Sequence, residues 1–590
     1  MCLASPLPAV IQSDGTIFLE VHNPLFERAR DCFMRFSDLV KSPEHMYTYR
    51  ISPLSLWNAA ACGLGAEEII RDLEAFSRYA VPENVKHMIR TTTERYGILR
   101  IYMQDGNLIL SSRDPMVFME VTSSERLAPY IEAKHRENAV ILRPNSRGFV
   151  KQALIKMGYP AEDLAGYVDG DPLEVRLRSV TRRGLPFFLR PYQIEASNAF
   201  YAGGHATGGS GVIVLPCGAG KTVVGLDVMA KLCTQTLILT TNVVALRQWI
   251  DEILDKTDLR EDQIGEYSGE KKELAPVTVT TYQMLTYRKK GAAGYPHFSI
   301  FNERNWGLII YDEVHLLPAP VFRITADLQG KRRLGLTATL LREDGREDDV
   351  FSLIGPKKFD KPWKELEAES WIAQAECHEI RVDLDQDDRL KYALASEKEK
   401  YGVAAVNRRK LPVVKAIVES LRDERILIIG QYIDQLSEVA AMLGAPFVSG
   451  HTPNSERQAF YDAFRRGELK VLVASKIANF AVDIPEASVA IQISGTFGSR
   501  QEEAQRLGRI LRPKSSGRPA RFYSIVSRNT KEQLFAQHRQ LFLTEQGYRY
   551  TIWEEDTFIQ AIAKASTGST SGATHPRSVL TDAGGNGPGR

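Results

Sequence analysis

The sequence is poor in cysteine and in long apolar runs. Its 590 residues include only 6 cysteines, which are scattered and form no CxxC pair. This pattern excludes a zinc ribbon, a cysteine-ligated iron–sulfur cluster and a disulfide framework, and it favours a reducing cytoplasm. No apolar run approaches the roughly 20 residues of a membrane span, so we expect no membrane partner.

The sequence also has little net charge. The 75 Lys and Arg nearly balance the 73 Asp and Glu, which leaves a formal net charge of +2. A strongly basic coat is therefore absent, and any contact with nucleic acid must come from local patches. The first residues, MCLASPLPAV, lack a basic region followed by an apolar stretch, so we expect no signal peptide and a cytoplasmic location.

Residues 1–113 are predicted to form a small α/β module. Alternating polarity predicts a strand at 17–21, and Ser52-Pro53 predicts the start of a helix. Further helices are expected around Ile69 and after Pro82, and Asp105-Gly106 predicts a hairpin. A winged-helix-like module and a small α/β interaction domain both fit this order.

Residues 114–185 are predicted to form a second small module. We expect a strand at 140–142, a helix at 149–157 and a strand that contains Val175 and Leu177. Four arginines crowd its end, where a solvated surface and a nucleic-acid contact are both possible: Arg176, Arg178, Arg182 and Arg183.

From residue 186 onwards, short apolar strands alternate with helices, which predicts parallel sheets covered by helices. The first set of strands is expected at 212–215, 236–239, 277–281, 308–311 and 334–336. The second set is expected at 426–429, 471–473, 489–493 and 522–525. The fold class is therefore α/β, with one parallel-sheet domain at 186–366, another at 367–565 and a disordered tail at 566–590.

The strongest local motif is PCGAGKT at 216–222, directly after an apolar strand and before a helical pattern. Glycines let backbone N–H groups surround phosphate oxygens, and the start of a helix adds positive potential. Lys221 can reach the β- and γ-phosphates of ATP, and the Thr222 hydroxyl can bind Mg²⁺. A glycine-rich turn is the alternative, because Leu215 replaces the first Gly of GxxxxGK[ST]. The predicted ATP-binding residues of this loop are Cys217, Gly218, Ala219, Gly220, Lys221 and Thr222.

A second motif, Asp312-Glu313-Val314-His315, follows an apolar strand. The carboxyl ends of parallel strands are where α/β sheets place their sites. Asp312 can hold Mg²⁺, and Glu313 can orient and deprotonate the attacking water; the alternative is a solvated acidic pair.

A third motif, QRLGRILR, occupies 505–512. Gln505, Arg509 and Arg512 are spaced i, i+4 and i+7, so they share one face of a helix. Guanidinium groups aimed at a γ-phosphate act as arginine fingers. Because they belong to the second sheet domain, we expect ATP to bind between the two domains; a basic surface helix is the alternative.

These motifs, together with LRPYQ at 189–193 and TAT at 337–339, occur in the order of superfamily-2 helicases. Longer stretches such as LGLTATLLRED, SKIANFAVDIP and GSRQEEAQRLGRILRPK resemble the xeroderma pigmentosum group B (XPB) family. The resemblance covers about residues 12–550 and lacks the large eukaryotic-type extension, so the chain looks like a compact prokaryotic form.

The resemblance implies two RecA-like helicase domains and an ATP- and Mg²⁺-dependent 3′-to-5′ DNA helicase or duplex translocase. Its setting would be nucleotide-excision repair on forked or damaged DNA, with a repair nuclease as a possible partner. Residues 138–180 would correspond to the family's damage-recognition module, and the helical stretch 387–410 to a thumb that grips DNA. It implies ATP binding by Arg190, Gln193 and Asp483, coupling by His315, Thr337 and Thr339, and DNA contact by Arg342, Glu343 and Asp344.

Two other functions stay open on the sequence. An RNA helicase has the same domains, although DEVH and the Arg-Glu-Asp triplet favour DNA. A scaffold that binds DNA and switches shape with the nucleotide needs no hydrolysis, which the intact motif residues argue against. A restriction-type translocase fused to a nuclease is a further option, but we find no nuclease motif after the second sheet domain.

Overall fold

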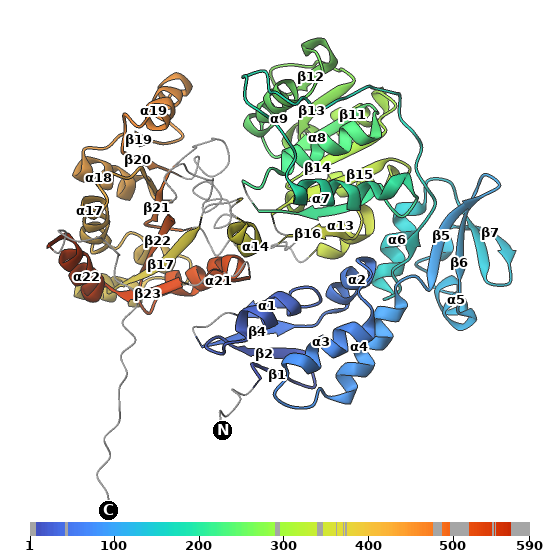
Figure 1. Cartoon of the computed structure of the whole chain (residues 1–590), viewed down its shortest axis with the longest axis horizontal. Helices are drawn as coiled ribbons and strands as arrows, with labels where there is room; N and C mark the ends of the chain where they lie inside the picture. The colour runs from blue at the N-terminus through green and yellow to red at the C-terminus, as the bar shows by residue number, and fades with distance from the viewer. Residues whose placement is uncertain are drawn as a thin grey trace, which may run out of the picture. The chain divides into compact units, whose positions relative to one another are not determined.

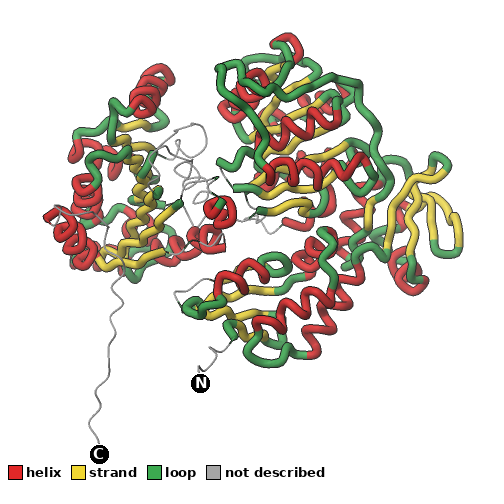
Figure 2. The backbone as a smooth tube through the Cα atoms, viewed as in Figure 1, coloured by secondary structure: helices red, strands yellow, loops and turns green. Residues whose placement is uncertain are grey.

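The computed structural model describes residues 7–41, 45–216, 218–288, 295–338, 346–361, 363–369, 371, 374–475, 487–495, 519–545, 548 and 550–567. The chain divides into two compact units, Met1–Glu369 with Glu545–Gly547 and Ser370–Thr544 with Tyr548–Arg590. Figures 1 and 2 show that each unit contains a large sheet with helices packed around it. Among the described helices, none has the length and apolar content that a membrane span requires.

The first module of unit 1 is an antiparallel sheet with helices beside it. Its described strands, in spatial order, are β1 (Ala9–Ile11), β2 (Thr16–Glu20), β4 (Met46–Arg50) and β3 (Asp38–Lys41). Its helices are α1 (Phe26–Phe33), α2 (Pro53–Ala61), α3 (Ala66–Phe76) and α4 (Glu83–Arg95). The Ser52 hydroxyl accepts a hydrogen bond from the Ser55 N–H at 3.0 Å and caps α2. The predicted strand at 17–21 and the three predicted helices are confirmed.

The hairpin around Asp105-Gly106 forms, but it belongs to the sheet of the second module. β5 (Leu99–Gln104) and β6 (Asn107–Ser112) pair with each other, and β6 pairs next with β8 (Ala139–Leu142). Apolar cross-strand pairs such as Ile109 and Ile141 hold β6 there. The sequence signal identifies the turn but not the sheet that the hairpin joins. The boundary predicted at residue 113 therefore cuts this sheet, and the helices and hairpin do not form one winged helix.

The second module places a five-stranded sheet beside a helix that contacts the first large sheet domain. Its other described elements are β7 (Ile131–Arg136), β9 (Glu162–Asp163), α5 (Pro115–Thr122) and α6 (Arg147–Lys156). Helix α6 packs against α12 (Ala319–Asp327) and α13 (Glu347–Leu353). The Gln152 side-chain amide on α6 donates a hydrogen bond to Asp349 Oδ1 on α13 at 2.8 Å.

The segment after β9 does not form the predicted strand. Among the described elements, Val175 and Leu177 belong to no strand; Leu177 makes an isolated bridge to Thr257, just after α9 (Val243–Lys256). Arg178 Nε donates to the carbonyl oxygen of Thr257 at 2.5 Å. The Arg178 side chain therefore makes a local contact with the end of α9.

The first large sheet is parallel. Its described strands, in spatial order, are β12 (Ile264–Tyr267), β13 (Val277–Thr281), β11 (Thr236–Thr240), β14 (Leu308–Asp312), β15 (Arg332–Thr337), β10 (Ser210–Val214) and β16 (Lys357–Asp360). The remaining helices of this domain are α7 (Pro191–Tyr201), α8 (Lys221–Leu232), α10 (Tyr282–Thr286), α11 (Ile300–Glu303) and α14 (Trp363–Ala368). Every strand predicted here from its apolar run is present.

Helices cover both faces of this sheet (Figure 1). Val212, Leu237 and Ile309 cluster with Phe322 of α12 and Leu353 of α13 on one face. The opposite face packs against α8 and α9, which contact each other. The carboxyl ends of the strands are thus held between two layers of helices.

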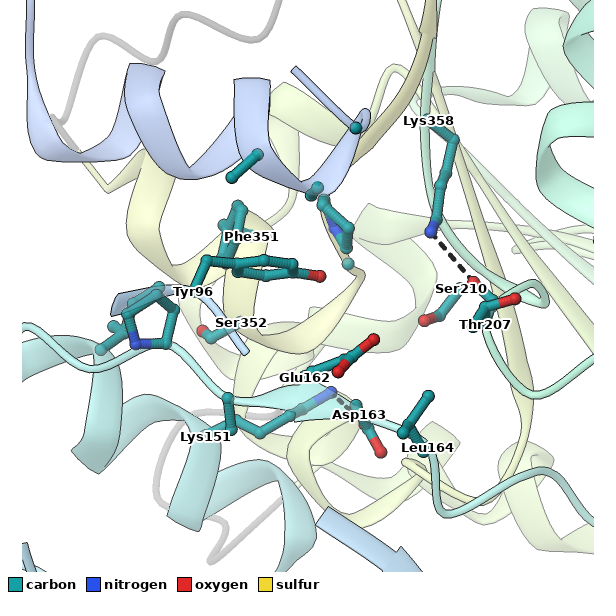
Figure 3. A pocket seen from close by; sticks show the side chains of 18 residues that line it. Tyr96, Lys151, Glu162, Asp163, Leu164, Thr207, Ser210, Phe351, Ser352 and Lys358 are labelled. Carbon is teal, nitrogen blue, oxygen red and sulfur yellow. Dashed lines mark hydrogen bonds and ion pairs between the residues drawn. The ribbon is translucent and has the colours of Figure 1, made fainter. Parts of the chain in front are cut away.

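A cavity of about 210 Å³ lies where the two small modules meet the first large sheet (Figure 3). Its walls include Tyr96, Lys151, Glu162, Phe351 and Lys358. Ser210, the first residue of β10, also lines it, whereas the predicted phosphate loop follows the last residue of β10. The cavity therefore lies at the amino end of β10, whereas the predicted nucleotide site lies at its carboxyl end.

The second large sheet, in unit 2, is also parallel. Its described strands, in spatial order, are β19 (Phe447–Val448), β20 (Val471–Ala474), β18 (Ile426–Ile429), β21 (Val489–Gln492), β22 (Ala520–Ser527), β17 (Ala375–Val382) and β23 (Tyr550–Glu554). Its helices include α15 (Gln386–Leu394), α16 (Lys400–Ala405), α17 (Lys410–Ser420), α18 (Ile433–Leu443), α19 (Asn454–Arg466), α21 (Lys531–Glu545) and α22 (Glu555–Thr567). The four strands predicted for this sheet are present. The disordered tail is predicted to begin at residue 566, but Ser566 and Thr567 are the last residues of α22, and residues 568–590 lie outside the described part of the chain.

The helical stretch predicted at 387–410 is divided into α15 and α16, and α17 begins at Lys410. Lys410, the last residue of the stretch that the family resemblance assigns to a DNA-gripping thumb, is fully buried and ion-paired with Glu532 at 2.7 Å. A side chain without solvent exposure cannot bind a DNA phosphate, so the prediction for Lys410 is wrong.

Candidate nucleotide-binding site

The predicted phosphate loop follows β10 and leads directly into α8. Gly218 and Gly220 have φ angles of 84° and 80°, a left-handed conformation that glycine adopts at little cost. Gly220 caps α8, so Lys221 and Thr222 are the first residues of this helix. The loop thus directs the start of a helix and its backbone N–H groups to the place where phosphate would bind.

Residues at the start of α7 hold this loop in place. The Tyr192 hydroxyl and the Gln193 side-chain amide both donate to the carbonyl oxygen of Ala219, at 2.7 and 2.9 Å. Gln193 Oε1 accepts the N–H of Arg190 at 3.0 Å, and the Arg190 guanidinium donates to the Tyr192 hydroxyl at 3.0 Å. Arg190 and Gln193 therefore lie at the loop, and ATP binding by these two residues stays a prediction.

The acidic pair lies at the carboxyl end of β14. Asp312 is the last residue of this strand, and the Tyr282 hydroxyl donates to its carbonyl oxygen at 2.8 Å. Glu313 has a φ of 49°, in the left-handed region that residues other than glycine seldom occupy. Lys221 Nζ lies 3.5 Å from Glu313 Oε1. The structure thus brings the phosphate-loop lysine and the predicted catalytic carboxylate together.

The electrostatics of the two acids differ. Burial and the charge of Glu313 raise the pKa of Asp312 to about 6, although hydrogen bonding to Trp249 and the charge of Lys221 act in the opposite direction. Burial also raises the pKa of Glu313, but the charges of Lys221 and His315 outweigh it and bring the pKa below its usual value. Glu313 is therefore ionised at neutral pH, as a proton acceptor must be.

His315 and Thr337 connect the acidic motif to the end of β15. His315 Nδ1 and the Thr337 hydroxyl lie 2.6 Å apart, and both side chains are buried. His315 Nδ1 also lies 3.5 Å from Glu313 Oε2. Two of the three predicted coupling residues are therefore in contact, in a chain of polar groups that reaches Glu313.

Asp312 and Thr222 have the chemistry of a magnesium site. Both present hard oxygen atoms, and Mg²⁺ in nucleotide sites is usually bound by one or two protein ligands together with phosphate oxygens. Each carboxylate oxygen of Asp312 accepts one protein hydrogen bond, Oδ2 from Trp249 and Oδ1 from the Glu313 N–H. A second lone pair on each oxygen is thereby left for a metal ion or its water.

Several predicted site residues lie outside the described part of the chain, so their roles stay predictions: Cys217, Thr339, Arg342, Glu343, Asp344, Asp483, Gln505, Arg509 and Arg512.

Sequence reasoning missed three residues that shape the site: Tyr192, Trp249 and Tyr282. Each reaches the site through a hydroxyl or indole N–H that donates to the phosphate loop or to Asp312, and the Tyr192 hydroxyl also accepts from Arg190. An aromatic residue at helical spacing indicates a buried position, but it does not show which distant polar atom the hydroxyl or indole N–H will meet. In the sequence, the clearest hint was Tyr192 beside Gln193 in LRPYQ.

A second parallel sheet repeats the strand order of the first, and the first alone carries a phosphate loop and acidic pair in its described part. Two RecA-like domains of this kind define an ATP-driven motor of the helicase class.

Comparison with known proteins specifies the family. Residues 366–574 match the family described as "ERCC3/RAD25/XPB C-terminal helicase". Residues 187–342 match "Type III restriction enzyme, res subunit", and residues 9–135 match "Helicase conserved C-terminal domain".

Curated relatives extend along nearly the whole chain. It is 54% identical to the DNA 3'-5' helicase XPB of Mycobacterium tuberculosis, over 94% of this chain and 98% of that protein. It is 53% identical to the DNA 3'-5' helicase XPB of Kineococcus radiotolerans, over 93% of this chain and 97% of that protein. A protein of Enterocytozoon bieneusi named as the XPB helicase/translocase subunit of general transcription and DNA repair factor IIH is 31% identical, over 92% of each chain. The chain belongs to the XPB family of DNA helicases and is an ATP-dependent enzyme.

Proposed function

We propose that the chain hydrolyses Mg·ATP at the phosphate loop and uses this energy to separate DNA strands in the 3′-to-5′ direction. The observation that carries the proposal is the pairing of Lys221 with Glu313 at 3.5 Å, across the carboxyl ends of β10 and β14. The side chains retain 11% and 17% exposure, so a ligand can reach both of them.

Each residue then has a separate task. Lys221 and the N–H groups at the start of α8 bind and orient the phosphates. Glu313 is ionised and accepts a proton from the attacking water. Magnesium bound by Asp312 and Thr222 would neutralise charge that develops on the phosphates. Arg509 and Arg512 would act as arginine fingers from the second domain, with Gln505 beside them.

Coupling to DNA is proposed to start at the His315–Thr337 contact. Thr337 ends β15, and the triplet Arg342-Glu343-Asp344 follows it within a few residues. A change at Glu313 would reach this segment through His315 and Thr337. Arg342 would hold a backbone phosphate, and the two acids would repel phosphates and force strands apart.

The biological setting we propose is nucleotide-excision repair in the cytoplasm, on forked or damaged duplex DNA, with a repair nuclease as partner. The support is the family to which the chain belongs and the second module, β5–β9, which lies directly against the ATP-binding domain. The alternative substrate, RNA, is distinguished by the test.

The test compares ATP turnover and strand separation on fluorescent forks of both polarities, made of DNA or RNA. We expect DNA-stimulated turnover and separation of forks with a 3′ loading strand. Alanine at Arg342, Glu343 and Asp344 together should leave DNA-stimulated turnover largely intact and abolish separation. Stimulation by RNA alone, or turnover without separation on any fork, would overturn the proposal.

A further inference from the structure

We infer that Trp249 is a positioning residue for ATP hydrolysis: its indole N–H fixes the Asp312 carboxylate in the orientation that holds the magnesium ion of the nucleotide. This rests on the proposed function, in which Asp312 is a ligand of that ion.

The Asp312 carboxylate is held by two donors that act on different oxygens. Trp249 Nε1 donates to Oδ2 at 2.9 Å, and the N–H of Glu313 donates to Oδ1 at 3.0 Å. A single donor would leave the carboxylate able to rotate about its Cβ–Cγ bond, because one contact does not define a plane. Two donors on opposite oxygens fix the plane, and with it the direction of the remaining lone pairs.

The indole ring also contacts both elements that carry the proposed magnesium ligands, α8 through Gly225 and β14 through Asp312. Trp249 lies on α9 and is only 2% exposed. Its ring packs on Gly225 of α8, where a Cβ atom would come within 2.7 Å of Trp249 Cη2 and 3.5 Å of Ile310 Cδ1 on β14. Glycine inside a helix is less favourable than alanine, so a packing reason is expected for it. The space that Gly225 leaves lets the indole bridge α8, which carries Thr222, and β14, which carries Asp312.

The hydrogen bond is what distinguishes this role from simple packing. A buried indole N–H needs an acceptor, and this one meets a carboxylate that also needs donors because it is buried. Phenylalanine could fill much of the same space on Gly225, but it has no donor. Hydrogen bonds that orient metal ligands are typically worth roughly 10–100-fold in metal affinity or activity.

The test is Trp249→Phe in the full-length chain, with binding of the non-hydrolysable fluorescent nucleotide mant-AMPPNP titrated against Mg²⁺. We expect the Mg²⁺ concentration for half-maximal effect to rise roughly 10-fold, while affinity without Mg²⁺ stays unchanged. ATP turnover on forked DNA should show the same shift, with kcat largely restored by excess Mg²⁺.

Trp306→Phe is the matched control. Trp306 is also fully buried, and its indole N–H donates to the carbonyl oxygen of Ile300 at 2.8 Å, so the same ring and one hydrogen bond are altered. We expect this variant to lose thermal stability without a change in Mg²⁺ dependence. An unchanged Mg²⁺ titration in Trp249→Phe, or an equal shift in Trp306→Phe, would overturn the inference.

Asp312→Asn separates this inference from the proposed function. If Asn at position 312 leaves the Mg²⁺ titration unchanged, Asp312 is not the ligand and the proposed function fails at that residue. If it shifts the titration and Trp249→Phe does not, only the positioning role fails. Should Trp249→Phe not fold, benzothienylalanine at position 249 keeps the ring shape, replaces the N–H by sulfur and undergoes the same titration.

Discussion

The two large sheets share one strand order, yet their Lys–Glu pairs differ. In unit 2, Lys410 Nζ lies 2.7 and 2.8 Å from the two oxygens of Glu532, and it also donates to the carbonyl oxygens of Ala405 and Ile493. Both side chains are 0% exposed. In unit 1, the Lys221–Glu313 pair is 3.5 Å apart and partly exposed.

This difference distinguishes an ion pair that stabilises the fold from one that lies at a candidate ligand-binding site. The ammonium of Lys410 has three N–H donors and four acceptors within reach, so it has no capacity for a ligand. In unit 1, the wider Lys221–Glu313 pair is partly exposed, and Gly220 and Glu313 beside it have left-handed backbone conformations. The same fold therefore supports a closed pair in unit 2 and a more open pair in unit 1, where we propose that nucleotide binds.

The largest expected effect is on the open pair. Lys221→Ala should abolish ATP hydrolysis, since Lys221 is proposed to bind the phosphates, and it should change thermal melting little, because its ion pair with Glu313 is wide and partly exposed. Phosphate release with forked DNA and a melting curve on the same sample measure both. Near-normal turnover would mean that the loop before α8 does not bind the phosphates.

Next in size is the loss of the carboxylate of this pair. Glu313→Gln should bind mant-AMPPNP normally and slow hydrolysis by about 10²–10⁴-fold, the usual contribution of a general base. Nucleotide binding by fluorescence and turnover by phosphate release separate the two steps. A Gln variant that hydrolyses ATP at the parent rate would assign the proton transfer to another group.

Removing the cation of the closed Lys410–Glu532 pair should lower the stability of unit 2. Lys410→Met leaves the Glu532 carboxylate buried without its cation, so unit 2 should lose about 3–5 kcal/mol of unfolding free energy. Hydrogen exchange in peptides from α17 during urea unfolding reports on this unit. The double variant Lys410→Met, Glu532→Leu should recover much of the loss, and equal destabilisation in both variants would show that packing dominates.

The smallest effect is expected for an exposed ion pair whose N···O distance is similar to that of the closed pair. Arg466 and Glu468 are 2.6 Å apart, but their side chains are 60% and 57% exposed. Arg466→Ala should leave the urea midpoint unchanged within error, because solvent screens such pairs. A large shift would show that distance, and not burial, decides the strength of these ion pairs.

The strands that the sequence predicted are the central ones. β11, β14 and β18 read as continuous apolar runs because helices cover both of their faces. The edge strands β12, β16, β19 and β23 went unpredicted, as did β17, which lies beside an edge. Their sequences, such as KKFD in β16, mix charged and apolar residues, so no apolar run marks them.

The site was predictable to the extent that its residues are adjacent in the sequence. Lys221 belongs to a glycine-rich loop typical of phosphate binding. Asp312 and Glu313 are neighbours at the end of an apolar strand. The contact between Trp249 and Asp312 joins residues 63 positions apart, and only the packing of α9 against the sheet brings them together. A local sequence pattern cannot show that two residues so far apart in the chain come into contact, so the sequence does not predict the role of Trp249.

The left-handed backbone of Glu313 has a consequence for protein engineering. Such a conformation typically costs roughly 1–3 kcal/mol for residues other than glycine, and asparagine tolerates it better than glutamate. A search for thermostable variants that scores melting temperature alone would therefore favour Gly or Asn at position 313. On the proposed mechanism, it would enrich stable proteins that lack the group for water activation, so libraries built on this chain should hold residue 313 constant and select for turnover as well.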